Sequence, residues 1–112
     1  MIVEKRSIEG GTVLKLEGVI RLGESAEFLT QTLDRVLEDD AGTVWLDFSR
    51  INYIDSTGIG EMVGYLGRFQ ERQRKLILIN PSDRIRKLLQ VAQLTELFPL
   101  YDTLEAALAA EK

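Results

Sequence analysis

The sequence predicts a small α/β domain in which about four helices pack against a mixed sheet of four to five strands. Two short apolar runs, TVWLDF (43–48) and KLILI (75–79), are typical of strands that are covered on both faces, as in a parallel sheet. A long helical pattern separates them, which indicates a strand–helix–strand crossover. The 112 residues contain no linker, repeat or low-complexity stretch, so we expect a single domain over residues 1–112.

The chain is expected to begin with two strands. Residues 2–8 are predicted to form an edge strand, which a pair of glycines closes with a turn. Residues 12–18 follow with an alternating pattern that is typical of a strand. This alternation places Leu14 and Leu16 on one face of the strand and Val13 on the other.

Two long helices are expected in the first two thirds of the chain. The first is predicted to be capped by Ser25, a preferred N-cap residue, and to stop before Gly42. Its apolar residues recur at helical spacing; they are Phe28, Leu29, Leu33, Val36 and Leu37. The central helix, between the two apolar strands, has the same spacing at Ile59, Met62, Val63, Leu66 and Phe69.

Shorter elements are expected in the last third of the chain. A third helix is predicted over 82–92, with Ser82 as its cap. Its apolar face consists of Ile85, Leu88, Leu89 and Ala92. The segment FPLY is expected to form a last short strand, and a C-terminal helix to begin at Thr103.

The composition argues against an enzyme. The chain has no cysteine and no histidine, which removes thiolate nucleophiles, Ser-His-Asp arrangements and the commonest metal ligands. A nucleophilic Ser56 would need another activating base, and no lysine lies nearby in sequence. A phospho-aspartate receiver centred on Asp47 would need an acidic pair after the first strand, where only Glu9 is available. We therefore expect no catalytic residues, no cofactor and no metal.

The charge pattern bears on partners and location. Fourteen basic and eighteen acidic residues give a net charge of −4, which disfavours nucleic-acid binding. The basic clusters are Arg68, Arg72, Arg74 and Lys75, then Arg84, Arg86 and Lys87. We interpret the first cluster as cations that stabilise a helix C-terminus. No apolar run approaches the ~20 residues of a membrane-spanning helix, and the start resembles no signal peptide, so a cytoplasmic location without membrane insertion is expected.

The segment Asp55-Ser56-Thr57 opens the central helix and is the strongest candidate for function. Asp, Ser and Thr are all preferred N-cap residues, but a helix needs only one cap. A hydroxyl at a helix N-terminus is also a favourable place for a phosphate, because free N–H groups and the helix dipole stabilise added negative charge. Capping and a phosphorylation switch therefore both remain open.

Three glycines mark one side of the same helix. Gly60, Gly64 and Gly67 are spaced at i, i+4 and i+7, and each costs about 1 kcal/mol relative to alanine in a helix interior. Close packing against a neighbouring element would explain them. A bare stripe that lets a partner approach the backbone would explain them as well.

The segment DFSRINYIDSTGIGEMVGYLGRF resembles the signature of STAS domains, in particular that of bacterial anti-sigma factor antagonists. The early strand with Leu14, Leu16 and Gly18, the strands TVWLDFS and KLILIN, and the final TLEAAL occur in the family's order, so that the resemblance covers nearly the whole chain. It implies that Ser56, or less favourably Thr57, is phosphorylated by an anti-sigma factor that is also a serine kinase. The unphosphorylated form would bind that kinase and release a sigma factor, and a cognate phosphatase would reset the switch.

The resemblance also implies which residues form the site. The switch motif would be Asp55, Ser56, Thr57, Gly58, Ile59 and Gly60, and the partner-binding residues would be Arg21, Gly23, Glu61 and Gly64. Arg21 departs from the family, which often has an acidic loop here, so the partner surface would have a different polarity or the partner would be a different one. STAS modules also serve as scaffolds without phosphorylation, and this is the alternative function. The sequence does not indicate an oligomeric state.

Overall fold

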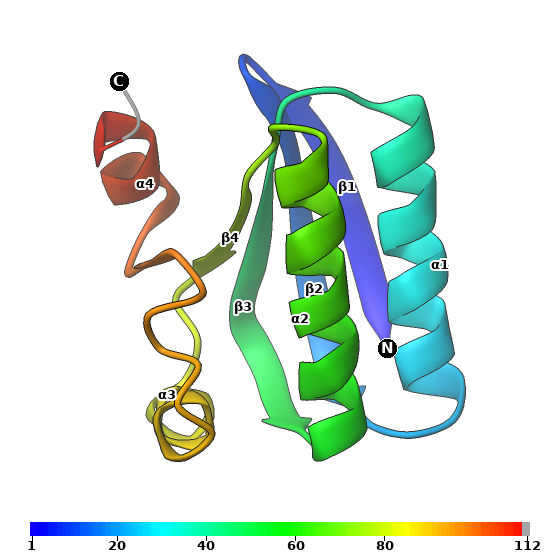
Figure 1. Ribbon diagram of the computed structural model, residues 1–112, viewed down its shortest axis with the longest axis vertical. Coiled ribbons are helices and arrows are strands. Elements are labelled where there is room, and N and C mark those ends of the chain that lie inside the picture. Colours follow the sequence, from blue (N-terminus) through cyan, green and yellow to red (C-terminus); the bar gives the residue numbers. More distant parts are fainter. Residues whose placement is uncertain (111–112) are drawn as a thin grey trace.

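The computed structural model describes residues 1–110, which contain five strands and four helices (Figure 1). In chain order they are β1 (Ile2–Ile8), β2 (Gly11–Ile20), α1 (Glu24–Asp39), β3 (Thr43–Ile54), α2 (Ser56–Glu71), β4 (Leu76–Ile79), α3 (Asp83–Val91), β5 (Leu100–Tyr101) and α4 (Leu104–Ala110). The strand order is β1-β2-β3-β4-β5, with β1 antiparallel to β2 and the other neighbours parallel. The predicted mixed sheet and its helices are thus confirmed.

The two faces of the sheet are covered unequally. Leu14 and Leu16 point to the face on which α1, α2 and α3 lie, and they belong to the main apolar core. Val13 points to the other face, where α4 covers a smaller cluster; its buried members are Val13, Trp45, Ile77, Ile79 and Ala107. Over β1 to β3 this second face is largely polar, with exposed or half-buried Arg6, Lys15, Asp47 and Ser49.

Strand β3 is longer than predicted and ends at Ile54 rather than near residue 48. Its second half continues to pair with β2, through two register shifts, so that Ile20 lies opposite Ile54. The Asp55 N–H then donates to the Ile20 carbonyl at 3.0 Å. Because both strands reach this far, the end of β2 and the start of α2 meet at one edge of the fold.

The start of α1 differs from the prediction. Gly23, with φ of 109°, is the N-cap residue, and Ser25 lies inside the first turn. The Ser25 hydroxyl accepts from the Arg21 N–H at 2.9 Å and donates to the Arg21 carbonyl at 3.1 Å, so it holds the preceding loop instead. Phe28, one of the apolar residues at helical spacing, is 37% exposed beside β1. The Ser82 cap of α3 is confirmed, because its hydroxyl accepts from the Ile85 N–H.

The basic cluster lies at a helix C-terminus as predicted, with Arg68 in the last turn of α2, but two of its arginines also bind a neighbouring helix. Arg72 and Arg74 each donate to the Leu37 carbonyl, at 2.9 and 3.0 Å, and Arg74 also donates to the Gly42 carbonyl at 2.8 Å. They therefore satisfy the free carbonyls at the C-terminus of α1, the neighbouring helix. Among residues 1–110, no helix has the length and apolar character needed to cross a membrane.

Candidate functional site

The N-terminus of α2 is capped by Asp55. One carboxylate oxygen, Oδ1, accepts from the Gly58 N–H at 2.8 Å, and the other, Oδ2, accepts from the Leu22 N–H at 2.9 Å. The N–H of Gly58, and then that of Leu22, lower the pKa of the Asp55 carboxyl below its ordinary value. Asp55 is therefore ionised at neutral pH and connects the start of α2 to the loop of residues 21–23.

Ser56 is the first residue of α2, and its side chain is exposed. Within residues 1–110 its hydroxyl makes no hydrogen bond, because the capping bond to the backbone comes from Asp55. Thr57, the next residue, is half-buried and faces the loop before α1. The structure thus assigns the cap to one member of the triplet and leaves the Ser56 hydroxyl uncommitted.

Gly58 is a glycine because no side chain fits there. A Cβ atom at this position would lie 2.7 Å from Ile20 Cγ2 and 2.8 Å from Ile54 Cγ1. Both isoleucines are buried at the ends of β2 and β3, so neither has room to move. Gly58 therefore allows the first turn of α2 to pack directly on the sheet, a role that the sequence pattern did not reveal.

The other glycines of α2 differ from Gly58. A Cβ atom at Gly60, Gly64 or Gly67 would meet nothing within 4 Å, so close packing does not explain them. Of the two explanations that the sequence left open, close packing is wrong. The three positions form a stripe of bare backbone on α2, which we call the glycine stripe. Ile59, within the switch motif, packs against the main core.

The loop of residues 21–23 lies beside the start of α2. Gly23, Thr57 and Glu61 line one shallow pocket of about 230 Å³, together with Leu22, Ala26, Glu27 and Thr30. The structure therefore brings Gly23 and Glu61 together, whereas Arg21 and Gly64 are not among the lining residues. Sequence reasoning missed Leu22, which is 77% exposed. Its signal was an apolar residue isolated between a charged residue and a glycine.

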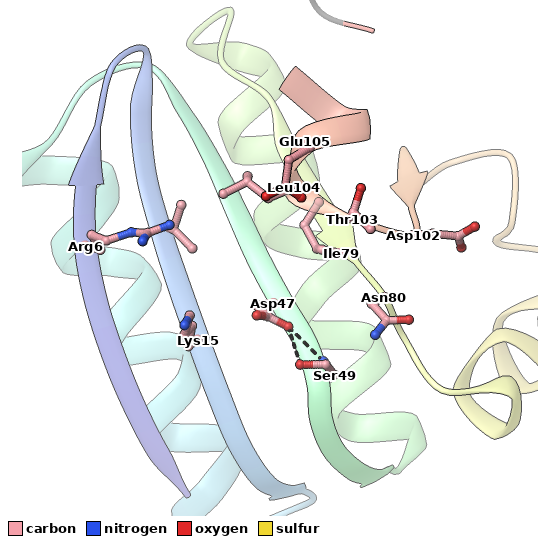
Figure 2. Close-up of a pocket in the computed structure, with 11 residues that line it drawn as sticks. Arg6, Lys15, Asp47, Ser49, Ile79, Asn80, Asp102, Thr103, Leu104 and Glu105 are labelled. Carbon is pink, nitrogen blue, oxygen red and sulfur yellow. Dashed lines mark hydrogen bonds between the residues drawn. The ribbon is translucent and has the colours of Figure 1, made fainter. Parts of the chain in front are cut away.

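A second, larger pocket of about 380 Å³ lies on the polar face of the sheet. Figure 2 shows Arg6, Lys15 and Asp47 on three neighbouring strands there, opposite Asp102 and Thr103 near the start of α4. Asp47 accepts from both the N–H and the hydroxyl of Ser49, at 3.0 and 2.7 Å. The residues of the switch motif do not line this pocket.

Known proteins resemble this chain in sequence. The family profile described as the STAS domain matches residues 2–107. A Staphylococcus aureus protein named anti-sigma-B factor antagonist is 29% identical over 69 residues, which cover 62% of this chain and 64% of that protein. The matched part of this chain thus spans slightly less than two thirds of that relative.

Solved structures share the fold. An anti-sigma factor antagonist from Mycobacterium paratuberculosis matches with a TM-score of 0.85 and 22% identity, covering 97% of this chain and 92% of the other. The antagonist SpoIIAA matches in its unphosphorylated form (TM-score 0.78, 23% identity, 96% and 93% covered) and, from Bacillus, in its phosphorylated form (0.74, 21%, 99% and 100%). Because the family profile spans nearly every residue from β1 to α4, the chain belongs to the STAS domain family.

Proposed function

We propose that this chain is an anti-sigma factor antagonist whose binding is switched by phosphorylation of Ser56. Its unphosphorylated form binds an anti-sigma factor that is also a serine kinase, frees a sigma factor in the cytoplasm, and is regenerated by a phosphatase. The observation that carries the proposal is that neighbouring residues of the motif have separate roles. Asp55 caps α2, so that the exposed Ser56 hydroxyl beside it is available to a kinase.

The site would stabilise a phosphate, and the phosphate would weaken the binding of a partner. A phosphate on Ser56 lies at the positive end of the α2 dipole, which stabilises negative charge. It adds about −1.5 to −2 charges beside the ionised carboxylate of Asp55. A protein surface docked there would have to accommodate this strongly hydrated group, and its affinity would fall.

The neighbouring surface is suited to a protein partner. Leu22 offers an exposed apolar anchor, and the glycine stripe lets a partner approach the backbone of α2 closely. Glu61 and Arg21 add charges of opposite sign at the margin, which would favour one partner over another. We infer that the chain acts by binding through this surface and that it catalyses no reaction itself.

The relatives support the same proposal. The Staphylococcus aureus protein is named for antagonism of an anti-sigma factor, and SpoIIAA has been solved both with and without phosphorylation. In this chain the segment that carries the resemblance contains Ser56 as an accessible serine directly after the capping aspartate.

The test uses Ser56→Ala and Ser56→Asp as parallel baits in native lysate of the source cells. We expect the Ala form to retain a kinase-type ATPase and the Asp form to lose it, because the introduced carboxylate imitates part of the phosphate charge. Thr95→Asp, an exposed site in the segment after α3, is the matched control for added charge and should retain the kinase.

Two outcomes would contradict the proposal. Equal retention of the same partners by both baits would mean that Ser56 is not a switch and that the chain is a phosphorylation-independent scaffold. Incubation of the retained kinase and ATP with wild type and with Ser56→Ala then locates the modified residue by mass spectrometry. Phosphate on the Ala variant at Thr57 would move the switch by one residue.

A further inference from the structure

The two edges of the sheet are very different. Strand β5 forms one edge with two residues, whereas β1 forms the other with seven. An edge strand presents a row of unpaired N–H and C=O groups to which another strand can add. The edge at β1 is therefore long enough to extend the sheet, and the edge at β5 is not.

The side chains of β1 alternate between the two faces of the sheet. Arg6 lies over the polar face, where it lines the pocket that contains Lys15 and Asp47 (Figure 2). Because successive residues of a strand alternate, Ile2, Glu4 and Ile8 share that face. Val3 and Lys5 point the other way, into a groove beside Phe28 of α1.

We propose that β1 pairs antiparallel with β1 of a second copy of this chain, about a two-fold axis at Lys5, so that one sheet runs through a dimer. In this register Glu4 lies opposite Arg6 of the other copy, and Arg6 opposite its Glu4. Ile2 and Ile8 lie opposite each other at both ends. All seven residues of the strand are paired; both Glu4–Arg6 pairs are of opposite sign, and Lys5 lies opposite Lys5 at the axis.

The charges also select this register. A shift by one residue would place side chains of opposite faces across from each other. A shift by two residues in either direction would set Glu4 opposite Glu4, or Arg6 opposite Arg6. Like charges directly opposite each other are destabilising. The central register also has one like pair, Lys5 opposite Lys5, but unlike its neighbours it has two pairs of opposite charge, so it is preferred.

The remaining charges of β1 are consistent with the pairing. Lys5 would meet Lys5 of the second copy, but each is already paired with its own Asp40 at 2.7 Å. Glu4 and Arg6, in contrast, form no ion pair within residues 1–110, and both are exposed.

Charged residues on an edge strand often prevent pairing. If all the charged residues of β1 had the same sign, their repulsion would prevent two copies of the strand from pairing. In β1 the two unpaired charges have opposite signs and lie symmetrically about Lys5, so the strand is complementary to itself. The surface around Ser56, Leu22 and the glycine stripe contains no residue of β1, so the dimer would leave the proposed partner site open.

The experiment is a charge swap followed by complementation, read by sedimentation equilibrium from about 0.02 to 2 mM. Wild type should dimerise within this range. E4R sets arginine opposite Arg6 twice, R6E sets glutamate opposite Glu4 twice, and each should weaken dimerisation on the order of 10- to 100-fold. An equimolar mixture of E4R and R6E restores both opposite-charge pairs and should form a heterodimer near wild-type affinity.

Two exposed sites outside β1 provide controls of equal charge change, E96R for E4R and K87E for R6E, and both should dimerise as wild type does. Native mass spectrometry of the E4R and R6E mixture distinguishes the heterodimer by mass. A misfolded variant could not form this heterodimer, so its detection shows that the loss of homodimers is not caused by misfolding. A wild type that stays monomeric throughout, or a dimer that E4R and R6E leave unchanged, would overturn the proposal.

Discussion

The two halves of α2 are built in opposite ways. The C-terminal half is tied to α1: the Tyr65 hydroxyl donates to the Asp34 carboxylate, Arg68 pairs with the same carboxylate at 3.3 Å, and Arg72 pairs with Glu38 at 2.8 Å. Along the N-terminal half, in contrast, Ser56 and Gly60 present exposed positions that make no such contacts, and the exposed Gly64 follows directly after that half. One helix thus has a firmly held end and an open end, and the proposed partner surface lies on the open one.

The open end has one tightly packed position, Gly58, so glycine substitutions in α2 should have opposite effects according to position. Gly58→Ala should have the largest effect, a loss of about 2–3 kcal/mol in the free energy of unfolding, because the added methyl group overpacks a site between two buried isoleucines. Urea denaturation at neutral pH measures this loss. An unchanged midpoint would show that Ile20 and Ile54 can move apart, contrary to their burial.

The contacts between the C-terminal half of α2 and α1 can be weakened by a substitution that leaves the shape of the side chain nearly unchanged. Tyr65→Phe removes the hydroxyl that donates to Asp34 and to the Thr30 carbonyl, and we expect a loss of about 1.5–2 kcal/mol. The Tyr65 side chain is nearly buried, although the Asp34 carboxylate that accepts from it is half exposed.

The same hydroxyl predicts a pH dependence. Burial, and then the hydrogen bond to Asp34, raises the pKa of Tyr65 from 10.0 to about 12 in the folded chain. Its stabilising contribution is complete below pH 10 and is lost as the pH rises through 12. Wild type should therefore lose more stability than Tyr65→Phe between these two values. Parallel curves over that range would refute the assignment.

The smallest expected change in stability is on the glycine stripe, at Gly64 in the middle of α2. Gly64→Ala should raise the free energy of unfolding by about 0.5–1 kcal/mol, because alanine favours the helix and its Cβ meets nothing. If the glycine stripe contacts the partner, the same variant should bind the kinase captured by Ser56→Ala more weakly. A gain in stability with unchanged affinity would remove Gly64 from the partner surface.

The sequence predicted those features that depend on local periodicity. The apolar runs of β3 and β4, the spacing of Met62, Leu66 and Phe69 in α2, and the cap at Ser82 are all found in the structure. Each of them is decided by neighbours within a few positions along the chain. The order of the elements followed from the same signals.

The contacts that the sequence did not predict arose where distant residues decide the outcome. Arg72 and Arg74 lie next to the end of α2 in sequence but bind carbonyls of α1, more than thirty positions earlier. The bond from Leu22 to Asp55 spans 33 positions, and nothing in either segment indicates it. The wrong cap at Ser25 has a local cause instead: Ser25 is a preferred cap by residue type, but Gly23, with positive φ, is the N-cap residue.

The bond between the Leu22 N–H and Asp55 provides a built-in reporter of the switch. A dianion on Ser56 would compete electrostatically with the carboxylate for the donors around it, and the Leu22 amide proton is one of the two that Asp55 holds most directly. Its chemical shift and exchange rate can be followed in an isotope-labelled sample without any attached probe. A single backbone resonance, remote in sequence from the modified serine, would then reveal the fraction of molecules that carry phosphate.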